Sequence, residues 1–188
     1  MIQKFRPIAI LVLVSFLWQS CANEEKTNPY LITKHQVGFL NDSTQVKDLK
    51  LVFKNDSISS FKNDSSFTGI TTDVHILNKE GTRLLSLSPT DALDSTATIR
   101  TVKIEDPKFV TDKGVGLNST FGQISAHYKI NRIDNLIKTI VINVDELNAT
   151  FAIDKEELPA NMRFDMSLNI DPIQIPDAAN IKYFMLHW

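Results

Sequence analysis

Residues 140–153 read Ile-Val-Ile-Asn-Val-Asp-Glu-Leu-Asn-Ala-Thr-Phe-Ala-Ile. Apolar side chains alternate with others from Ile140 to Val144, and they alternate again from Ala149 to Ile153. Successive side chains of a strand point to opposite faces, so each segment predicts a strand with one apolar face. The acidic pair Asp145-Glu146 falls near the turn between them.

A period of two also recurs on both sides of this stretch. Residues 74–87 predict a hairpin, because two apolar segments flank the turn sequence Asn78-Lys79-Glu80-Gly81. Residues 98–105 predict another strand. Residues 164–170 show the cleanest alternation in the chain, so we expect a strand there with one buried face. Residues 181–188 are apolar on both faces, which predicts a central strand buried on both sides.

Two short helices are expected among these strands. Each has apolar residues at helical spacing, namely Val46, Leu49 and Phe53 in the first and Phe121, Ile124 and Tyr128 in the second. Thr44 is the expected N-cap of the first helix. The second begins at Ser119 or at Thr120, which has capping-box spacing to Gln123. The fold class is therefore α+β, a mostly antiparallel sheet with two short helices.

The regions before the two helices are similar. Val37-Gly38 precedes the first helix and Val115-Gly116 precedes the second. This suggests two repeated helix-then-sheet halves, residues 31–97 and 98–188. Any strand-to-helix turn can use a glycine and a Ser or Thr cap, so one compact domain over 31–188 without duplication stays open.

The beginning of the chain has the layout of a secretory signal peptide, which we assign to residues 1–20. Lys4 and Arg6 precede an apolar segment, residues 8–18. That segment is too short for a membrane span, which needs about 20 residues. Ser20 before Cys21 resembles a bacterial lipobox, and the resemblance implies cleavage before Cys21 and its lipidation. Residues 21–30 are polar and read as a tether.

Cys21 is the only cysteine in the chain. An internal disulfide is excluded, and an ordinary free or buried thiol is the alternative to lipidation. Lipidation implies a protein bound to the membrane through Cys21, in the cell envelope and at the outer membrane, on its periplasmic or cell-surface face. Residues 22–25, Ala-Asn-Glu-Glu, resemble the surface-export signal of Bacteroidetes lipoproteins, although a plain hydrophilic tether explains them equally well.

A second resemblance covers residues 104–128. A strand ending in Glu105-Asp106-Pro107 leads to the glycine-rich segment 114–121 and then to a short helix that ends at Tyr128. This order is similar to a motif in envelope lipoproteins such as the RpoE-regulated lipoprotein family. The resemblance implies an envelope location and an α+β module, and it implies no reaction.

The charge balance and the absence of known motifs argue against several classes of function. The chain has 20 Lys and Arg against 22 Asp and Glu. Without residues 1–20 the balance is 18 against 22, so no basic surplus favours nucleic acid. The four histidines are widely spaced, so we expect no metal site, and no cofactor motif is present. They are His35, His75, His127 and His187.

Acidic pairs provide the alternative to a binding role. Asp145 with Glu146, Glu156 with Glu157, and Asp165 with Asp171 could serve an envelope hydrolase if two carboxylates faced each other across a cleft. Solvated side chains are the preferred interpretation. We therefore expect a non-catalytic binding or assembly module that recognises an envelope protein or a glycan.

Serine-rich segments suggest modification. Asp42-Ser43-Thr44, Asp56-Ser57-Ile58 and Asp94-Ser95-Thr96 resemble the short O-glycan acceptor motif of exported Bacteroidetes proteins. This resemblance implies O-glycosylation at Ser43, Ser57 and Ser95. Residues 54–67 are rich in Asn, Asp and Ser, so we expect solvated turns there rather than a calcium site.

Overall fold

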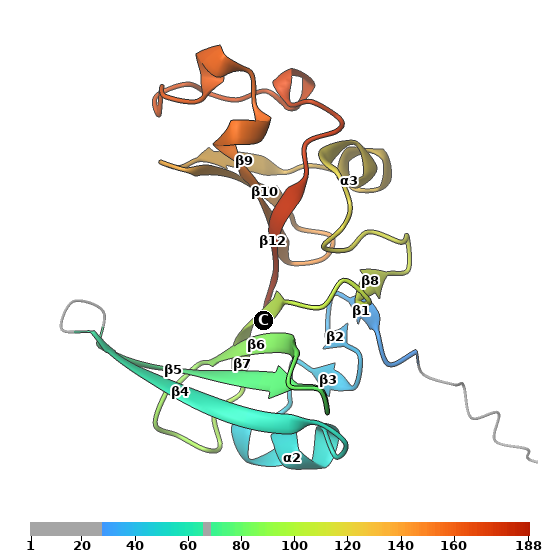
Figure 1. Ribbon diagram of the computed structural model, residues 1–188, viewed down its shortest axis with the longest axis vertical. Helices are drawn as coiled ribbons and strands as arrows, with labels where there is room; N and C mark the ends of the chain where they lie inside the picture. Colours follow the sequence, from blue (N-terminus) through green and yellow to red (C-terminus); the bar gives the residue numbers. More distant parts are fainter. Residues whose placement is uncertain (1–27, 66–68) are drawn as a thin grey trace, which may run out of the picture.

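The computed structural model describes residues 28–65 and 69–188 (Figure 1). Cys21, the predicted signal peptide and most of the predicted tether lie outside the described residues. Within the described part, no helix is both long and apolar enough to cross a bilayer.

The described chain forms two sheets and several short helices. The large sheet contains β4 (Ser57–Ser65), β5 (Gly69–Leu77), β6 (Arg83–Pro89), β7 (Ile99–Ile104), β9 (Arg132–Asn135), β10 (Thr139–Val144), β11 (Ala149–Asp154) and β12 (Ile181–His187). The small sheet contains β1 (Leu31–Thr33), β2 (Gln36–Val37), β3 (Leu40–Asn41) and β8 (Val110–Thr111). The α-helices are α2 (Leu49–Val52) and α3 (Phe121–His127), and the 3-10 turns are η1 (Val46–Asp48), η2 (Lys155–Glu157), η3 (Ala160–Met162) and η4 (Pro172–Gln174). A mostly antiparallel sheet with two short α-helices is thus confirmed.

The large sheet has the strand order β4-β5-β6-β7-β12-β11-β10-β9. Every neighbouring pair in it is antiparallel. The order consists of two four-stranded meanders, β4–β7 and β9–β12, joined where β7 pairs with β12. The hairpin predicted over 74–87 is β5–β6, and the two strands predicted over 140–153 are β10 and β11.

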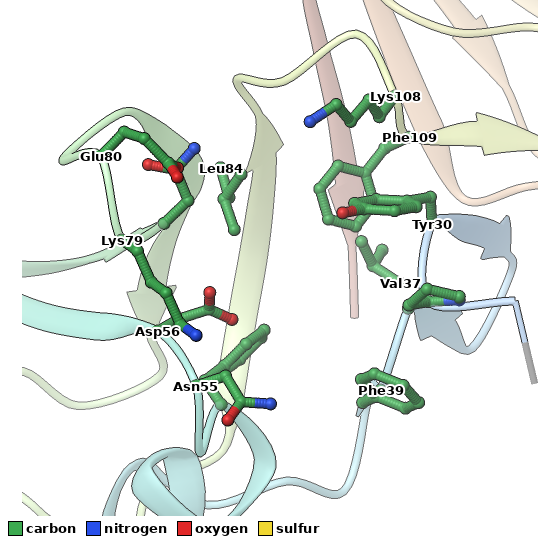
Figure 2. Close-up of a pocket in the computed structure, with 14 residues that line it drawn as sticks. Tyr30, Val37, Phe39, Asn55, Asp56, Lys79, Glu80, Leu84, Lys108 and Phe109 are labelled. Carbon is green, nitrogen blue, oxygen red and sulfur yellow. The ribbon is translucent and has the colours of Figure 1, made fainter.

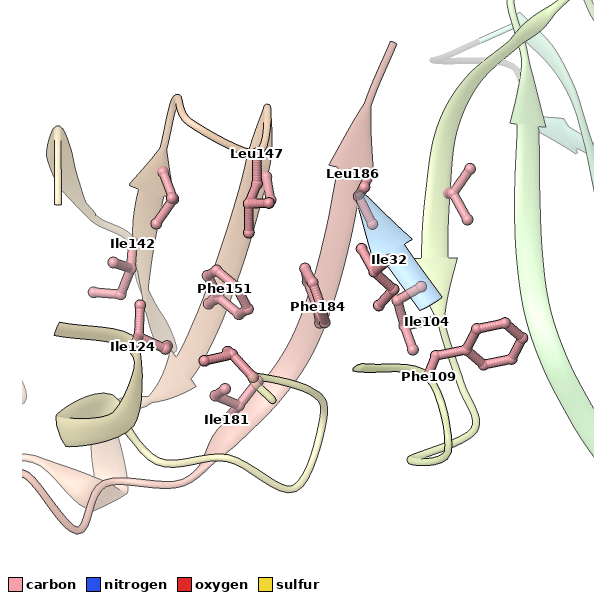
Figure 3. Close-up of a cluster of buried hydrophobic side chains, with 14 of the residues drawn as sticks. Ile32, Ile104, Phe109, Ile124, Ile142, Leu147, Phe151, Ile181, Phe184 and Leu186 are labelled. Carbon is pink, nitrogen blue, oxygen red and sulfur yellow. The ribbon is translucent and has the colours of Figure 1, made fainter. Parts of the chain in front are cut away.

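One face of the large sheet holds the core. Leu85, Ile104, Phe184 and Phe151 face one another across four adjacent strands, and each is at most 1% exposed. The Phe151 and Phe184 rings stack at 4.3 Å between centroids (Figure 3). The aromatic pair therefore lies next to the seam between the two meanders.

The small sheet and α3 cover this apolar face. Ile32 of β1 and Ile124 of α3 are fully buried, and their side chains point toward the strands (Figure 3). Gly38, at the β2–β3 turn, has φ +59°, and a Cβ there would overlap the Pro29 carbonyl oxygen. Only glycine tolerates both conditions, so Gly38 allows Pro29, near the start of the described chain, to lie close against the β2–β3 turn.

The opposite face of the large sheet is open and mostly polar. Ser86, Lys103, Met185 and Thr150 form the adjacent row on that face. Residues 181–188 are therefore central in the sheet, as predicted, but they are not buried on both sides. Tyr183 is 36% exposed.

Of the two predicted helix N-caps, only the one at α3 is confirmed. At α3, Gln123 Oε1 accepts a hydrogen bond from the Thr120 amide at 3.0 Å, so Thr120 is the cap rather than Ser119. The first helix begins later than expected, with Gln45 preceding η1. Thr44 instead accepts a hydrogen bond from the Asn41 amide at 3.1 Å and stabilises the turn after β3.

The strand predicted over residues 164–170 is wrong. This segment is irregular, and Phe164 and Met166 are 88% and 53% exposed. Asn135 Nδ2 donates to the carbonyl oxygens of Asp165 and Leu168 at 3.0 and 2.9 Å, so these acceptors bond to a side chain rather than to a ladder. Pro159 and Pro172 bracket the segment and favour the short turns η3 and η4.

Of the solvated turns expected over residues 54–67, the part at residues 54–56 is confirmed, and the part at residues 57–65 is wrong. Residues 57–65 form β4, which pairs with β5 along its whole length at the edge of the large sheet. An edge strand tolerates a polar sequence because one of its sides faces water.

Candidate functional site

A pocket of about 330 Å³ opens between the small sheet, the end of α2 and the β5–β6 turn (Figure 2). We call it the Tyr30 pocket. Its lining comes from six separate segments of the chain: Pro29, Tyr30, Val37, Gly38, Phe39, Phe53, Asn55, Asp56, Asn78, Lys79, Glu80, Leu84, Lys108 and Phe109. This size lies within the usual range for small-ligand sites.

One wall of the Tyr30 pocket is aromatic. The Tyr30 and Phe109 rings meet edge to face, with 5.2 Å between centroids and 77° between planes. Phe109 is only 3% exposed and anchors this wall in the core, whereas Phe39 is 53% exposed. Lys108 Nζ lies 5.9 Å from the centre of the Tyr30 ring, where the ring attracts a cation.

The facing wall is polar. Asn55 and Asp56 follow α2, and Lys79 and Glu80 come from the β5–β6 turn (Figure 2). That turn is fixed by Asn78, whose Oδ1 accepts from the Thr82 amide at 2.8 Å. The wall therefore presents carboxylates, an amide and an ammonium group opposite aromatic rings. This combination can hold a ligand that has both a flat apolar face and hydroxyl groups.

The histidines do not gather. His35 bonds to Asp42 at 2.7 Å and His187 lies 2.9 Å from the Thr150 hydroxyl. His127 is exposed on α3. No group of three His, Cys, Asp or Glu that could hold a metal ion occurs in residues 28–65 and 69–188.

His75 belongs to a network on the open face of the sheet. Ser86 Oγ donates to Glu105 Oε1 at 2.9 Å and lies 3.0 Å from His75 Nδ1. Lys103 also contacts Glu105, at 2.9 Å. Burial, followed by the charge of Arg83, lowers the pKa of His75. In a nucleophilic triad the histidine stands between serine and acid, whereas here the serine does, so this network holds strands together.

Several of the six carboxylates in the predicted pairs bond to neighbouring groups. Glu146 pairs with Lys113 at 2.7 Å, and Asp171 caps η4 by accepting from the Ile173 amide. Asp165 accepts from Ser167 Oγ at 2.6 Å, which holds the pKa of Asp165 below its ordinary value. None of the six carboxylates lines the Tyr30 pocket.

The three predicted O-glycan acceptors are all exposed. Ser43 lies after β3 and donates to Asn41 Oδ1 at 2.7 Å. Ser57 begins β4, and the Ser95 carbonyl accepts from the Lys47 amide at 2.9 Å. Each is accessible at the surface, and none of the three lies in the Tyr30 pocket.

Sequence reasoning missed the Tyr30 pocket. Its residues are far apart in the chain, and no two of them form a recognised motif. The available signals were aromatic residues beside turns, at Tyr30 and Phe39, but core packing explains such residues equally well from sequence.

Neither a protein-family model nor a curated protein matches the chain. Its fold is similar to that in the crystal structure of the uncharacterized protein yfeY from Escherichia coli. The TM-score is 0.56 at 11% sequence identity, and the match covers 84% of this chain and 99% of that one. At this identity the likeness concerns the fold alone.

Proposed function

We propose that this chain is a lipid-anchored cell-envelope protein whose folded part is a non-catalytic binding module. The proposed envelope location is supported by the signal-peptide layout of residues 1–20 and by the lipobox-like position of Cys21. The first described strand begins at Leu31, directly after the tether. Two or more acyl chains on Cys21 would make attachment stable, whereas one would be marginal.

The ligand that fits the Tyr30 pocket best is a glycan. Sugar rings have an apolar C–H face that stacks on aromatic side chains, and their hydroxyl groups bond to carboxylates and amides. Asn55 and Asp56 lie across the pocket from Phe39 and Tyr30. This arrangement is the observation that carries the proposal. A glycan is preferred to a protein partner because the pocket is concave and small.

A binding measurement on the chain from residue 21 onward, with Cys21→Ser to prevent acylation, tests this role. Envelope oligosaccharides from peptidoglycan and lipopolysaccharide are screened on an array, and hits are measured by calorimetry. We expect Phe39→Ala to weaken binding about five- to tenfold and Asp56→Asn to do so by a similar factor. Phe39 is half exposed, so its loss should leave the fold intact.

Phe164→Ala is the matched control, because Phe164 is an exposed phenylalanine outside the pocket. It should leave glycan affinity unchanged. Glycan binding that survives both pocket substitutions, or no glycan binding at all by the folded protein, would refute the glycan role.

We further propose that the fold consists of two duplicated halves, with the boundary after β7 rather than before Thr98. The strand order supports this, because β4 to β7 and β9 to β12 stand in mirrored positions about the β7–β12 seam. Register shifts support it too. One falls between Ser88 and Pro89 in β6, and one between Ala152 and Ile153 in β11, the corresponding strand. A third shift, between Ile76 and Leu77 in β5, has no counterpart in β10.

The helix starts support the duplication independently. The Val46 and Lys47 amides donate to the carbonyls of Ala97 and Ser95 at 3.0 and 2.9 Å. In the second half, the amides of Phe121 and Gly122 donate to the carbonyls of Ala179 and Asp177, both at 2.9 Å. In each half the helix start thus bonds to the segment just before the last strand of the meander.

A further inference from the structure

A second cavity, of about 500 Å³, lies at the β9–β10 end of the large sheet. We call it the Lys155 cavity. It is formed by the β9–β10 turn, η2, the segment after η3 and the start of β12, and its lining residues are Ile137, Lys138, Asp154, Lys155, Glu156, Arg163, Phe164 and Lys182. It shares no lining residue with the Tyr30 pocket.

Lys155 is buried without a partner. It is 4% exposed, and its Nζ makes no hydrogen bond within the described part of the chain. A buried ammonium group without a counter-charge costs several kcal/mol, so one normally pairs with an acid. The nearby Asp165 carboxylate feels the charge of Lys155, but its hydrogen bonds come from the Ser167 hydroxyl and amide, at 2.6 and 2.9 Å, and not from Lys155 Nζ.

The other charges around the cavity leave a positive excess. Asp154 forms an ion pair with Lys182, with 2.6 Å between Oδ2 and Nζ. Arg163 Nε donates to the Leu158 carbonyl at 2.8 Å, which fixes the guanidinium at the cavity wall. Lys138 forms no ion pair with any described residue. Against Lys138, Lys155 and Arg163 there remain Glu156, which is exposed, and Asp165, whose pKa the charge of Lys155 helps to lower.

The rim of the Lys155 cavity is apolar. Ile137 and Phe164 line it and are 73% and 88% exposed. Leu136 and Met166 flank them at 48% and 53% exposure, and the Asn135 bond to Asp165 ties the two segments together. Four of the nine exposed large hydrophobic residues found in the described part of the chain are thus grouped at one end of the sheet. Such grouping marks an interaction surface.

We propose that the Lys155 cavity and its rim bind an anionic lipid surface, with an acidic headgroup at Lys138 and Arg163, attracted also by the charge of the buried Lys155, and acyl chains against Ile137 and Phe164. A free inorganic anion would need the cations but would leave the apolar rim unused. Basic groups next to exposed apolar side chains are the combination by which peripheral segments enter the headgroup region of a bilayer.

Co-sedimentation with lipid vesicles tests the proposal, again with the chain from residue 21 carrying Cys21→Ser. We expect binding to vesicles of equal parts phosphatidylcholine and phosphatidylglycerol, and little binding to phosphatidylcholine alone. Phe164→Ser should lower partitioning about tenfold. Lys138→Gln should lower it about fivefold. High salt should weaken it, because charge attraction to the surface is screened.

The controls are exposed residues of the same types elsewhere. Ile173 is 89% exposed and does not line the cavity, and Lys79 lies in the Tyr30 pocket. Ile173→Ser and Lys79→Gln should leave vesicle binding unchanged. Glycan binding at the Tyr30 pocket should be unaffected by Phe164→Ser, so this proposal and the glycan role can fail separately.

Three results would overturn the proposal. One is equal binding to acidic and neutral vesicles. Another is a loss with Ile173→Ser as large as the loss with Phe164→Ser. The third is no vesicle binding at all, including the case in which inorganic phosphate alone raises the melting temperature, since the cavity would then take a free anion.

Discussion

At the scale of a single residue, we expect Lys155 to lower the stability of the free protein and to favour its binding to acidic lipid. Its buried Nζ has no partner among the described residues, so the charge destabilises the free protein. We expect Lys155→Met, which keeps the length and removes the charge, to raise the free energy of unfolding by about 1 to 4 kcal/mol. Urea unfolding measures this.

The same substitution should weaken binding to acidic vesicles, so the two readouts move in opposite directions. Lys138→Met, at an exposed position of the same cavity, should change stability by less than about 0.5 kcal/mol. A destabilised Lys155→Met variant would mean that the ammonium group has a stabilising partner in the folded protein.

Single residues also show what the sequence could not predict about the site. Phe53 was expected on the apolar face of the first helix and is buried in the core, yet it lines the Tyr30 pocket, as does the buried Phe109. Asn55 and Asp56 read as turn residues, and their position opposite an aromatic wall depends on how α2 packs. Pocket membership is set by tertiary contacts, which local patterns do not contain.

At the scale of the element, the two faces of β12 should respond differently to truncation. Phe184 is fully buried and stacks on Phe151. Phe184→Ala should cost about 3 to 5 kcal/mol, a large part of the stability of a domain this size. Tyr183→Ala, on the open face, removes a ring 4.8 Å from Lys103 Nζ and should cost about 1 kcal/mol or less.

Urea unfolding of both variants compares the two faces directly. Equal losses from Phe184→Ala and Tyr183→Ala would mean that the open face is covered in solution.

The ion pair between β11 and β12 should make stability depend on pH. The Lys182 bond lowers the pKa of Asp154 below its ordinary 3.8, and the same bond raises the pKa of Lys182 above 10.5. The Asp154 contribution is therefore present above pH 3.8 and is lost as pH falls through the lowered value. The Lys182 contribution is present below pH 10.5 and is lost as pH rises through the raised value.

Thermal unfolding between pH 7 and pH 2 measures the acid limb. Lys182→Met should reduce the loss on acidification only slightly, because the pair is partly exposed and screened by solvent. An unchanged acid limb in Lys182→Met would mean that the pair does not persist in solution.

Elements were predictable where an apolar face met the core. β10 and β11 follow from their alternation because the buried register leaves only one arrangement. β12 was predicted from its apolar composition, which gave its central place but not its exposed face. Residues 164–170 alternate equally well but bury little more than Ile170, since prolines and the Asn135 bonds direct the segment away from the sheet. β4 was missed for the opposite reason, because an edge strand needs no apolar pattern.

At the scale of the whole molecule, the proposed lipid anchor and the positions of the two proposed sites are related. The described chain starts beside the small sheet, and the β9–β10 turn lies at the far end of the large sheet (Figure 1). A lipid on Cys21 would therefore hold the Tyr30 pocket near the tether and leave the Lys155 cavity remote from it. The lipid surface proposed for the Lys155 cavity would therefore be a second membrane contact, separate from the anchor at Cys21.

Mass spectrometry of the protein from a membrane fraction tests the central claim, that a lipid on Cys21 holds this module in the envelope. The account predicts a mature N-terminus at Cys21, with residues 1–20 removed and a diacylglyceryl group on the sulfur. Cys21→Ser should leave residues 1–20 uncleaved and carry no lipid. A wild-type chain that begins at Met1, or one that carries an unmodified Cys21, would contradict the account.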